Sequence, residues 1–157
     1  MLSVSEIFES VQGEGPNRGE PVIFLRTAGC NLRCTWCDTP YALELRQGTR
    51  MSTEEVVEKI MSFEPKHIVL TGGEPMIQQQ FLKPVFEELG DEYFIEVETN
   101  GTILPSETLE GVVDRWNVSP KLQNSSISKQ YREVQSCMEY FAKNSKAFIK
   151  FVICNQS

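Results

Sequence analysis

Strand-like apolar runs alternate with helical stretches along this 157-residue chain, and this alternation limits the possible folds more than any other feature. The runs span residues 22–26, 67–70, 93–97, 116–118 and 147–153. Strands that alternate with helices are typical of parallel sheets built from right-handed crossover units. We therefore predict an α/β fold around a parallel sheet, and the length suits one domain, residues 1–157, with a hydrophobic core.

Helix signals fall between the strand runs. Ser52 and Glu55 have the spacing of a capping box, and apolar residues follow at helical spacing over 56–61. Further helices are predicted over 77–89, 107–113 and 129–143. Pro84 lies inside the first of these and predicts a kink or a break there.

Polar or glycine-rich segments follow each of the first four strand runs. These segments are 30–37, 71–75, 98–101 and 119–121. Taken singly, glycine-rich motifs such as 72–73 and 100–101 are better explained as turns. Because the carboxyl ends of parallel strands meet on one face, where such folds bind ligands, the four segments together predict a functional site.

Three cysteines within the first segment, Cys30, Cys34 and Cys37, have the spacing CxxxCxxC. They supply three thiolates to a cubane cluster of about four irons, which leaves one iron open to a small molecule. A structural zinc site is the simpler alternative, but it needs a fourth ligand and is usually built from two pairs. The remaining candidates, His67, Cys137 and Cys154, form no second pair, and a redox CxxC has no need of Cys30.

The other segments carry groups that suit a nucleoside joined to an amino acid. Gly72 and Gly73 allow close approach to the backbone and are expected to leave two N–H groups free. Glu74 is expected to accept hydrogen bonds from an ammonium group. Glu98 and Asn100 suit ribose hydroxyls, and 119–121 offers a hydroxyl and an ammonium group to a carboxylate.

Composition excludes several other function classes. A net charge of -7 disfavours binding to nucleic-acid phosphates, and no apolar run reaches the length of a membrane-spanning helix. The N-terminus has no basic region followed by an apolar stretch, so we expect no signal peptide. An odd count of five cysteines then suits the reducing cytoplasm, where thiolates stay available for metal.

The cysteine spacing, with Trp36 before the last cysteine and Gly-Gly-Glu-Pro at 72–75, resembles the radical S-adenosylmethionine superfamily. The resemblance implies a partial (β/α) barrel and a [4Fe–4S] cluster held by the three cysteines. It implies that S-adenosylmethionine binds the open iron and is cleaved by one electron. The resulting 5'-deoxyadenosyl radical would take a hydrogen atom from the substrate.

Further segments narrow the resemblance to the 7-carboxy-7-deazaguanine synthase family. They are 9–15, Arg26, 37–39, Thr71, 98–101 and 119–121. The family implies conversion of 6-carboxy-5,6,7,8-tetrahydropterin to 7-carboxy-7-deazaguanine by ring contraction with loss of ammonia, in queuosine biosynthesis. It also implies Mg²⁺, a flavodoxin or ferredoxin as electron donor, and a homodimer.

The resemblance assigns roles to individual residues. Expected contacts to S-adenosylmethionine come from Trp36, Cys37, Asp38, Gly73, Glu74, Glu98, Ser119, Pro120 and Lys121. The expected pterin site consists of Val11, Gln12, Gly13, Glu14, Arg26 and Thr71. Arg26 would pair with the substrate carboxylate, and the Thr39 hydroxyl would bind Mg²⁺. The alternative, structural roles are a surface ion pair for Arg26 and a hydrogen bond within a turn for Thr39.

Two other function classes stay open at this point. One is a radical enzyme that activates a protein glycine, which would not need the 12–15 segment or Arg26. The other is a noncatalytic iron–sulfur or zinc-binding module. The family continues with a further strand and a segment that closes the substrate pocket, so a chain ending at Ser157 is expected to be a shortened barrel with pocket closure in question.

Four residues are expected to have structural roles. Cys137 lies at helical spacing with Val134, Met138 and Phe141, which together with Tyr131 are predicted to share one side of the 129–143 helix. Trp116 is expected in the core. His67 and Cys154, at the ends of strand runs, are also expected to be structural.

Overall fold

The structure is a computed structural model that describes residues 1–153, so the prediction for Cys154 lies outside the described residues. The strands are β1 (Leu2–Val11), β2 (Pro21–Thr27), β3 (Thr49–Met51), β4 (His67–Gly72), β5 (Phe94–Thr99), β6 (Arg115–Val118) and β7 (Ala147–Ile149). The α-helices are α1 (Thr53–Met61), α2 (Gln79–Leu89), α3 (Glu107–Glu110), α4 (Lys129–Arg132) and α5 (Gln135–Lys143). Four 3-10 turns span Pro40–Ala42, Leu45–Gln47, Pro75–Gln78 and Gln123–Ser125.

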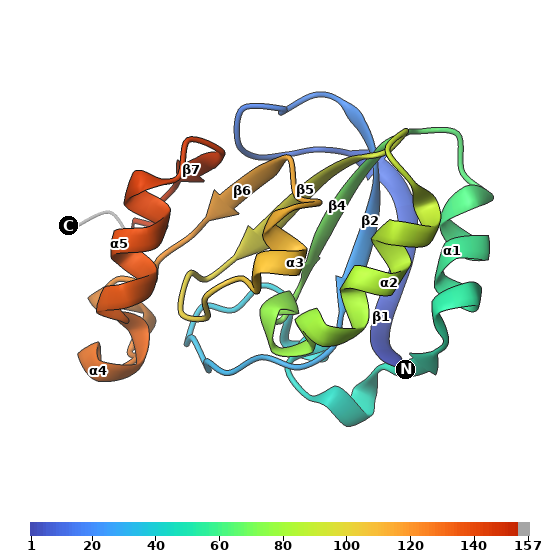
Figure 1. Ribbon diagram of the computed structural model, residues 1–157. Helices are drawn as coiled ribbons and strands as arrows, with labels where there is room; N and C mark the ends of the chain where they lie inside the picture. Colours follow the sequence, from blue (N-terminus) through green and yellow to red (C-terminus); the bar gives the residue numbers. More distant parts are fainter. Residues whose placement is uncertain (154–157) are drawn as a thin grey trace.

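The described strands form one sheet in the order β3-β1-β2-β4-β5-β6-β7. From β2 to β7 the neighbouring strands are parallel and follow chain order, whereas β1 is antiparallel to both β2 and β3. Helices α1, α2 and α3 cover one face of the sheet (Figure 1). The predicted α/β class is confirmed, and the sheet is an open, partial barrel.

Side chains alternate between the two faces of the sheet, as the strand period requires. Alternate residues such as Leu70, Val97 and Trp116 are fully buried in the core beneath the helices. Polar residues occupy the opposite, concave face. Arg26 is the register partner of Thr71, and Glu98 is the register partner of Asn117, so polar groups form a row across the sheet.

The structure confirms the capping box and most of the predicted elements. Ser52 accepts from the Glu55 N–H while the Glu55 carboxylate accepts from the Ser52 N–H. The predicted strands correspond to β2, β4, β5 and β6, and Pro84 lies inside α2. None of the helices within residues 1–153 is long and apolar enough to cross a membrane.

Two predictions near the C-terminus were wrong. The helix expected over 129–143 is divided at Glu133 and Val134, because α4 is fixed to a loop while α5 packs on the core. Arg132 donates to the Ile127 and Lys121 carbonyls, which holds α4 away from the axis of α5. The strand expected over 147–153 ends at Ile149, after which the chain turns toward the loop that follows β6.

The apolar side predicted for the 129–143 helix was only partly right, since Phe141 and Val134 pack on the core but Tyr131 and Met138 do not. Tyr131 and Met138 are exposed by 62% and 43%, whereas Cys137 and Phe141 are buried. The break shifts the helical phase, so that these two residues of α5 face the core. The structural roles predicted for Cys137 and Trp116 are confirmed by their burial.

Candidate active site

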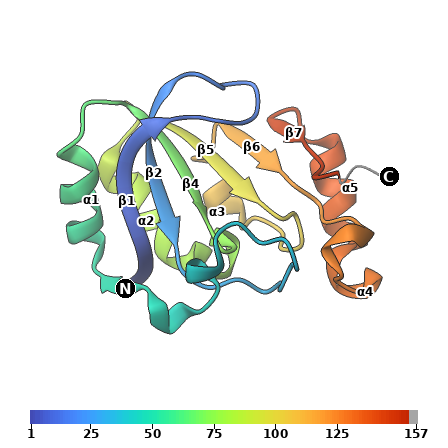
Figure 2. The same cartoon turned by 180° about the vertical axis from the view of Figure 1, so that it is seen from behind.

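A cavity of about 340 Å³ opens on the concave face of the sheet, beside the carboxyl ends of the parallel strands. Its wall includes most of the residues predicted for the site: Gln12, Gly13, Glu14, Arg26, Cys30, Cys34, Trp36, Cys37, Asp38, Thr39, Thr71, Gly73, Glu98, Ser119 and Lys121. The loop formed by residues 12–20 reaches this wall from the amino ends of the strands, opposite the cysteine-bearing loop (Figure 2).

Three predicted site residues do not line the cavity. Val11 is 58% exposed at the end of β1, where alternation along the strand turns it outward. Pro120 lies between Ser119 and Lys121, which do line the wall. Glu74 is completely buried behind the wall, so its predicted contact with a ligand needs correction.

The cysteine-bearing loop is held by backbone hydrogen bonds at both ends. Near its start, Gly29 donates to the Ala42 carbonyl at 2.8 Å and Cys30 donates to the Leu43 carbonyl at 3.0 Å. Further along, Thr35 donates to the Ser125 carbonyl at 3.1 Å. These bonds direct three free thiols toward one cavity although the loop has little regular secondary structure.

Gly72 and Gly73 line the cavity and also serve this loop, and the Gly73 N–H, one of the two predicted to be free, has a backbone partner. A Cβ atom on Gly73 would lie 2.3 Å from the Gly29 carbonyl oxygen, and one on Gly72 would lie 2.2 Å from that of Thr27. The Gly73 N–H donates to the Thr27 carbonyl at 3.2 Å. The two glycines therefore let β4 pass close to the backbone that begins the cysteine loop.

Glu74 joins three loops around the cavity. Its N–H donates to the Gly29 carbonyl at 2.8 Å, and its carboxylate accepts from the Thr99 hydroxyl and from the Asn100 N–H. The Asn100 amide in turn donates to the Asn31 side chain at 2.9 Å. Burial raises the pKa of Glu74, and these donors oppose the rise. The side chain predicted to hold an ammonium group is a structural brace.

Burial controls the electrostatics of the thiols. It raises the pKa of Cys30 to about 11 and that of Cys34 above its usual value, an effect that Lys121 opposes at Cys34. The Lys121 ammonium lies 5.4 Å from the centre of the Trp36 ring. Metal binding needs the cysteines as thiolates, and burial disfavours their negative charge. A positively charged metal group in the cavity would stabilise these thiolates.

Arg26 and Thr39 each have a protein partner in the structure. The Arg26 Nε donates to Glu6 at 2.7 Å, and no other hydrogen bond of Arg26 forms within residues 1–153. Its terminal nitrogens thus remain for a ligand on the cavity wall. The Thr39 hydroxyl donates to the Asp38 carboxylate at 2.7 Å in an exposed turn.

Lys150 is a wall residue that the sequence did not reveal. Its ammonium forms an ion pair with Glu14, and Val152 beside it also lines the cavity. The Asn124 amide donates to the Val152 carbonyl at 2.9 Å, which holds this segment across the cavity. Because 147–153 has the pattern of a strand, nothing in it predicts a turn toward the site. The segment supplies part of the wall of a pocket whose closure the sequence left in question.

Zinc receives no support from the geometry. Across the described residues 1–153, no three His, Cys, Asp or Glu side chains gather closely enough to hold a single metal ion. Three thiols set apart around one cavity suit a larger cluster better than a single ion.

Comparisons with known proteins agree with this geometry. Residues 24–134 match the model of the Radical SAM superfamily. The 7-carboxy-7-deazaguanine synthase of Pyrobaculum aerophilum is 40% identical over 98% of this chain and 68% of its own length. That of Hyperthermus butylicus is 37% identical over 99% of this chain and 67% of its own.

A solved structure is similar as well. The crystal structure of QueE from Escherichia coli matches with a TM-score of 0.71 at 29% identity, over 96% of this chain and 70% of that one. The chain thus spans about two thirds of the length of these relatives. It belongs to the 7-carboxy-7-deazaguanine synthase family of radical S-adenosylmethionine enzymes.

Proposed function

We propose that this chain converts 6-carboxy-5,6,7,8-tetrahydropterin to 7-carboxy-7-deazaguanine, with ring contraction and loss of ammonia, in queuosine biosynthesis. The observation that carries the proposal is a single cavity bordered by three free thiols and by the unpaired end of the Arg26 guanidinium. The three thiols suit the cofactors of the superfamily, and the free end of the guanidinium suits a substrate carboxylate.

The residues present fit a [4Fe–4S] cluster and S-adenosylmethionine. Beside the thiols, the buried indole N–H of Trp36 has no hydrogen-bond partner among residues 1–153. Lys121 forms no ion pair with a carboxylate within residues 1–153 and faces the same cavity. A donor and a cation are therefore left for a ligand that carries a purine and a carboxylate. When bound, the two cofactors supply the one-electron chemistry that removes a hydrogen atom from the substrate.

The protein's own groups then have binding and shielding roles. Arg26 orients the substrate through its carboxylate, and Thr71 donates to Glu98 at 2.8 Å on the adjoining wall. Burial raises the pKa of Glu98, which the Thr71 hydroxyl opposes. The ionised Glu98 carboxylate accepts hydrogen bonds from a polar ligand, and its protonated form can also donate one. Lys150 and Val152 exclude water from one side of the cavity.

We propose that the protein works in the cytoplasm and receives its electron from a small redox protein. Its described cysteines are free thiols, which suits a reducing cytoplasm and a flavodoxin or ferredoxin as donor. We also propose that residues 1–157 act as one catalytic core domain and that two copies form a homodimer.

Iron analysis and product identity together test the function. About four irons per chain and cleavage of S-adenosylmethionine dependent on the pterin are expected of the synthase. Formation of a glycyl radical on an added protein, with no change of the pterin, would instead favour the activating enzyme.

Arg26→Met is expected to raise the KM for the pterin about 100-fold, because a partly buried, charged partner of the carboxylate is lost. Arg26→Lys keeps the charge but loses the planar fork, so we expect a smaller rise of about tenfold. Initial rates over a range of pterin concentrations measure both. An unchanged KM in both variants would mean that Arg26 is only the partner of Glu6.

Thr39→Ala is expected to lose Mg²⁺ stimulation of ring contraction while retaining its iron. The Thr39 hydroxyl is an oxygen donor of the kind that Mg²⁺ prefers, and it lies on the cavity wall. Rates measured across a Mg²⁺ titration test this, with Thr39→Ser as the matched variant that keeps the hydroxyl. Equal stimulation of the wild type and Thr39→Ala would contradict the role.

A further inference from the structure

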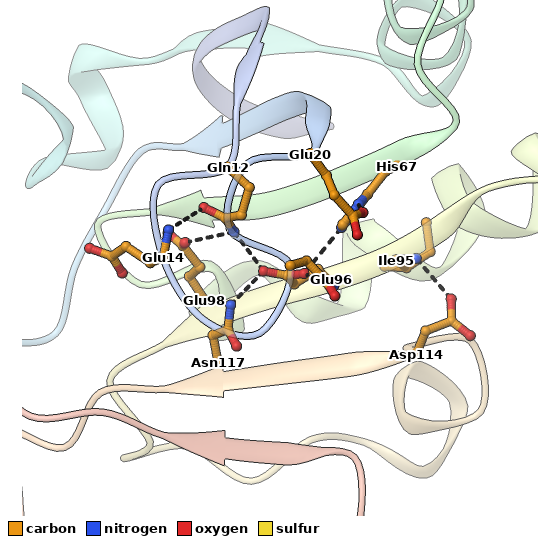
Figure 3. Close-up of polar contacts among 10 residues, drawn as sticks. Gln12, Glu14, Glu20, His67, Ile95, Glu96, Glu98, Asp114 and Asn117 are labelled. Carbon is orange, nitrogen blue, oxygen red and sulfur yellow. Dashed lines mark hydrogen bonds and ion pairs between the residues drawn. The ribbon is translucent and has the colours of Figure 1, made fainter.

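Glu96 gathers four hydrogen-bond donors although it does not line the cavity. One carboxylate oxygen accepts from the side-chain amides of Gln12 and Asn117, each at 2.5 Å. The other accepts from the Asn17 amide at 2.6 Å and from the His67 imidazole at 3.1 Å. The side chain is fully buried, and Figure 3 shows its contacts with Gln12 and Asn117. Every one of these donors is thus bound to a carboxylate that water does not reach.

Two of these four contacts hold the loop of residues 12–20. Gln12 and Asn17 attach its beginning and middle to Glu96. Glu20 attaches its end, since its carboxylate lies 3.1 Å from the second ring nitrogen of His67. The two ends of the loop are also joined, because the Gln12 N–H donates to the Glu20 carbonyl at 2.9 Å. The loop therefore rests on the buried pair of Glu96 and His67.

Gly15 allows this loop to lie against the sheet. Its φ of 67° is unusual for other residues, and a Cβ atom there would lie 2.7 Å from the amide nitrogen and oxygen of Asn117. Asn117 itself is completely buried and fixed by Glu96. The close approach and the hydrogen bonds thus act on the same stretch of the loop.

The orientation of the cavity wall depends on these contacts. Gln12, Gly13 and Glu14 form the part of the wall that the loop supplies. Because the Gln12 amide nitrogen donates to Glu96 and to Glu98, its oxygen must point the other way, where it accepts from the Glu14 N–H at 3.2 Å. Glu96 thereby determines which polar groups this wall presents, without itself touching a ligand.

We propose that Glu96 is a positioning residue, which holds loop 12–20 in the conformation that binds the substrate, and that His67 makes this hold dependent on pH. The inference rests on the proposed function only in assigning residues 12–14 to the pterin site. The attachment of the loop is a property of the protein alone and can be measured without any substrate.

The charged groups around Glu96 determine the sign of the pH dependence. They are His67 from β4, Glu20 from the loop, Glu98 from β5 and Arg115, its register partner in β6. Burial lowers the pKa of His67, but its bonds to the two glutamates raise it above the usual value overall. Burial raises the pKa of Glu96, but the imidazole and amide donors lower it overall.

The attachment is therefore strongest between these two pKa values. A His67 pKa that is raised by folding gives stabilisation that is complete at low pH and is lost as pH rises through that pKa. A Glu96 pKa that is lowered by folding gives stabilisation that is lost as pH falls through it. Near neutral pH and above, only the His67 transition is relevant, so the loop loosens on the alkaline side.

Glu96→Gln tests the role with almost no change of shape. One carboxylate oxygen becomes an NH₂ group, which cannot accept from the amide donors that face it. Amide hydrogen exchange in residues 12–20 of the substrate-free protein is expected to rise about tenfold or more. The KM for the pterin is expected to rise about tenfold while kcat changes less than about threefold, because the cysteine loop is untouched.

Asp114→Asn is the matched control. Asp114 accepts from the Ile95 N–H at 2.8 Å, so it braces the same strand at a site away from the loop (Figure 3). This variant is expected to leave loop exchange and KM near wild-type values. His67→Gln keeps a donor but cannot ionise, so the alkaline rise of KM that we expect of the wild type is expected to be absent from this variant.

The results separate this inference from the proposed function. Faster exchange of residues 12–20 in Glu96→Gln than in Asp114→Asn supports the positioning role, whatever the substrate proves to be. Equal exchange in the two variants, or a loss of kcat with unchanged KM, would overturn it. If the wild type leaves the pterin unchanged, the proposed function fails, and loop exchange alone decides the role of Glu96.

Discussion

Cys34→Ala is expected to abolish turnover and to leave less than about one iron per chain after reconstitution, compared with about four in the wild type. The three thiols lie on the wall of one cavity, and removing one leaves two ligands where the cluster needs three. The iron content and the absorbance of the reconstituted protein measure the loss. We expect S-adenosylmethionine cleavage to fall by at least about 1,000-fold with it.

Cys137→Ala is the control for this experiment. Its thiol, which belongs to α5, is buried in the core and does not line the cavity. The variant is expected to retain a full complement of iron, with a loss of stability of about 1 kcal/mol from the smaller side chain. A full cluster in Cys34→Ala, or its loss in Cys137→Ala, would show that the ligands had been wrongly assigned.

Gly73→Ala is expected to lower the free energy of unfolding by about 3 kcal/mol and to impair cluster assembly. The added methyl group would lie 2.3 Å from the Gly29 carbonyl oxygen and 2.7 Å from that of Ala42. Both atoms belong to the backbone that orients the cysteine loop, so relief of the clash must move that loop. Denaturant unfolding of the metal-free protein separates the loss of stability from the loss of iron.

Gly111→Ala provides the comparison for this substitution. Its nearest contacts would be at 3.7 Å, an ordinary packing distance, so stability is expected to change by less than about 1 kcal/mol. An equal free energy of unfolding in the two variants would mean that the close approach of Gly73 to Gly29 does not restrict the side chain at position 73.

The parallel sheet was predictable because its strands carry a strong local signal. Runs such as 68–70 are apolar throughout, as strands buried on both faces tend to be. β1 was missed because Ser3, Ser5 and Glu6 interrupt its apolar residues, although it pairs with β2 along most of its length. The break before α5 was missed because contacts of Arg132 with a distant loop produce it.

The site was predictable in its residues more than in their roles. Glycines at 72 and 73 signal a close approach, but the sequence does not say whether a ligand or another backbone approaches. Glu74 lies in a recognisable motif, and only the fold shows that its carboxylate is enclosed by Thr99 and Asn100. Glu96 and Lys150 carry no local signal, since their partners Gln12 and Glu14 are far away in the sequence.

Family membership favours a radical enzyme over a noncatalytic module, and the identity of the product is the measurement that tests the account most directly. Cluster-reconstituted protein is incubated without oxygen with a low-potential reductant, S-adenosylmethionine, Mg²⁺ and 6-carboxytetrahydropterin. The products are then identified by mass spectrometry. We predict 7-carboxy-7-deazaguanine together with 5'-deoxyadenosine. Formation of 5'-deoxyadenosine with the pterin unchanged, from protein with a full cluster, would contradict the account.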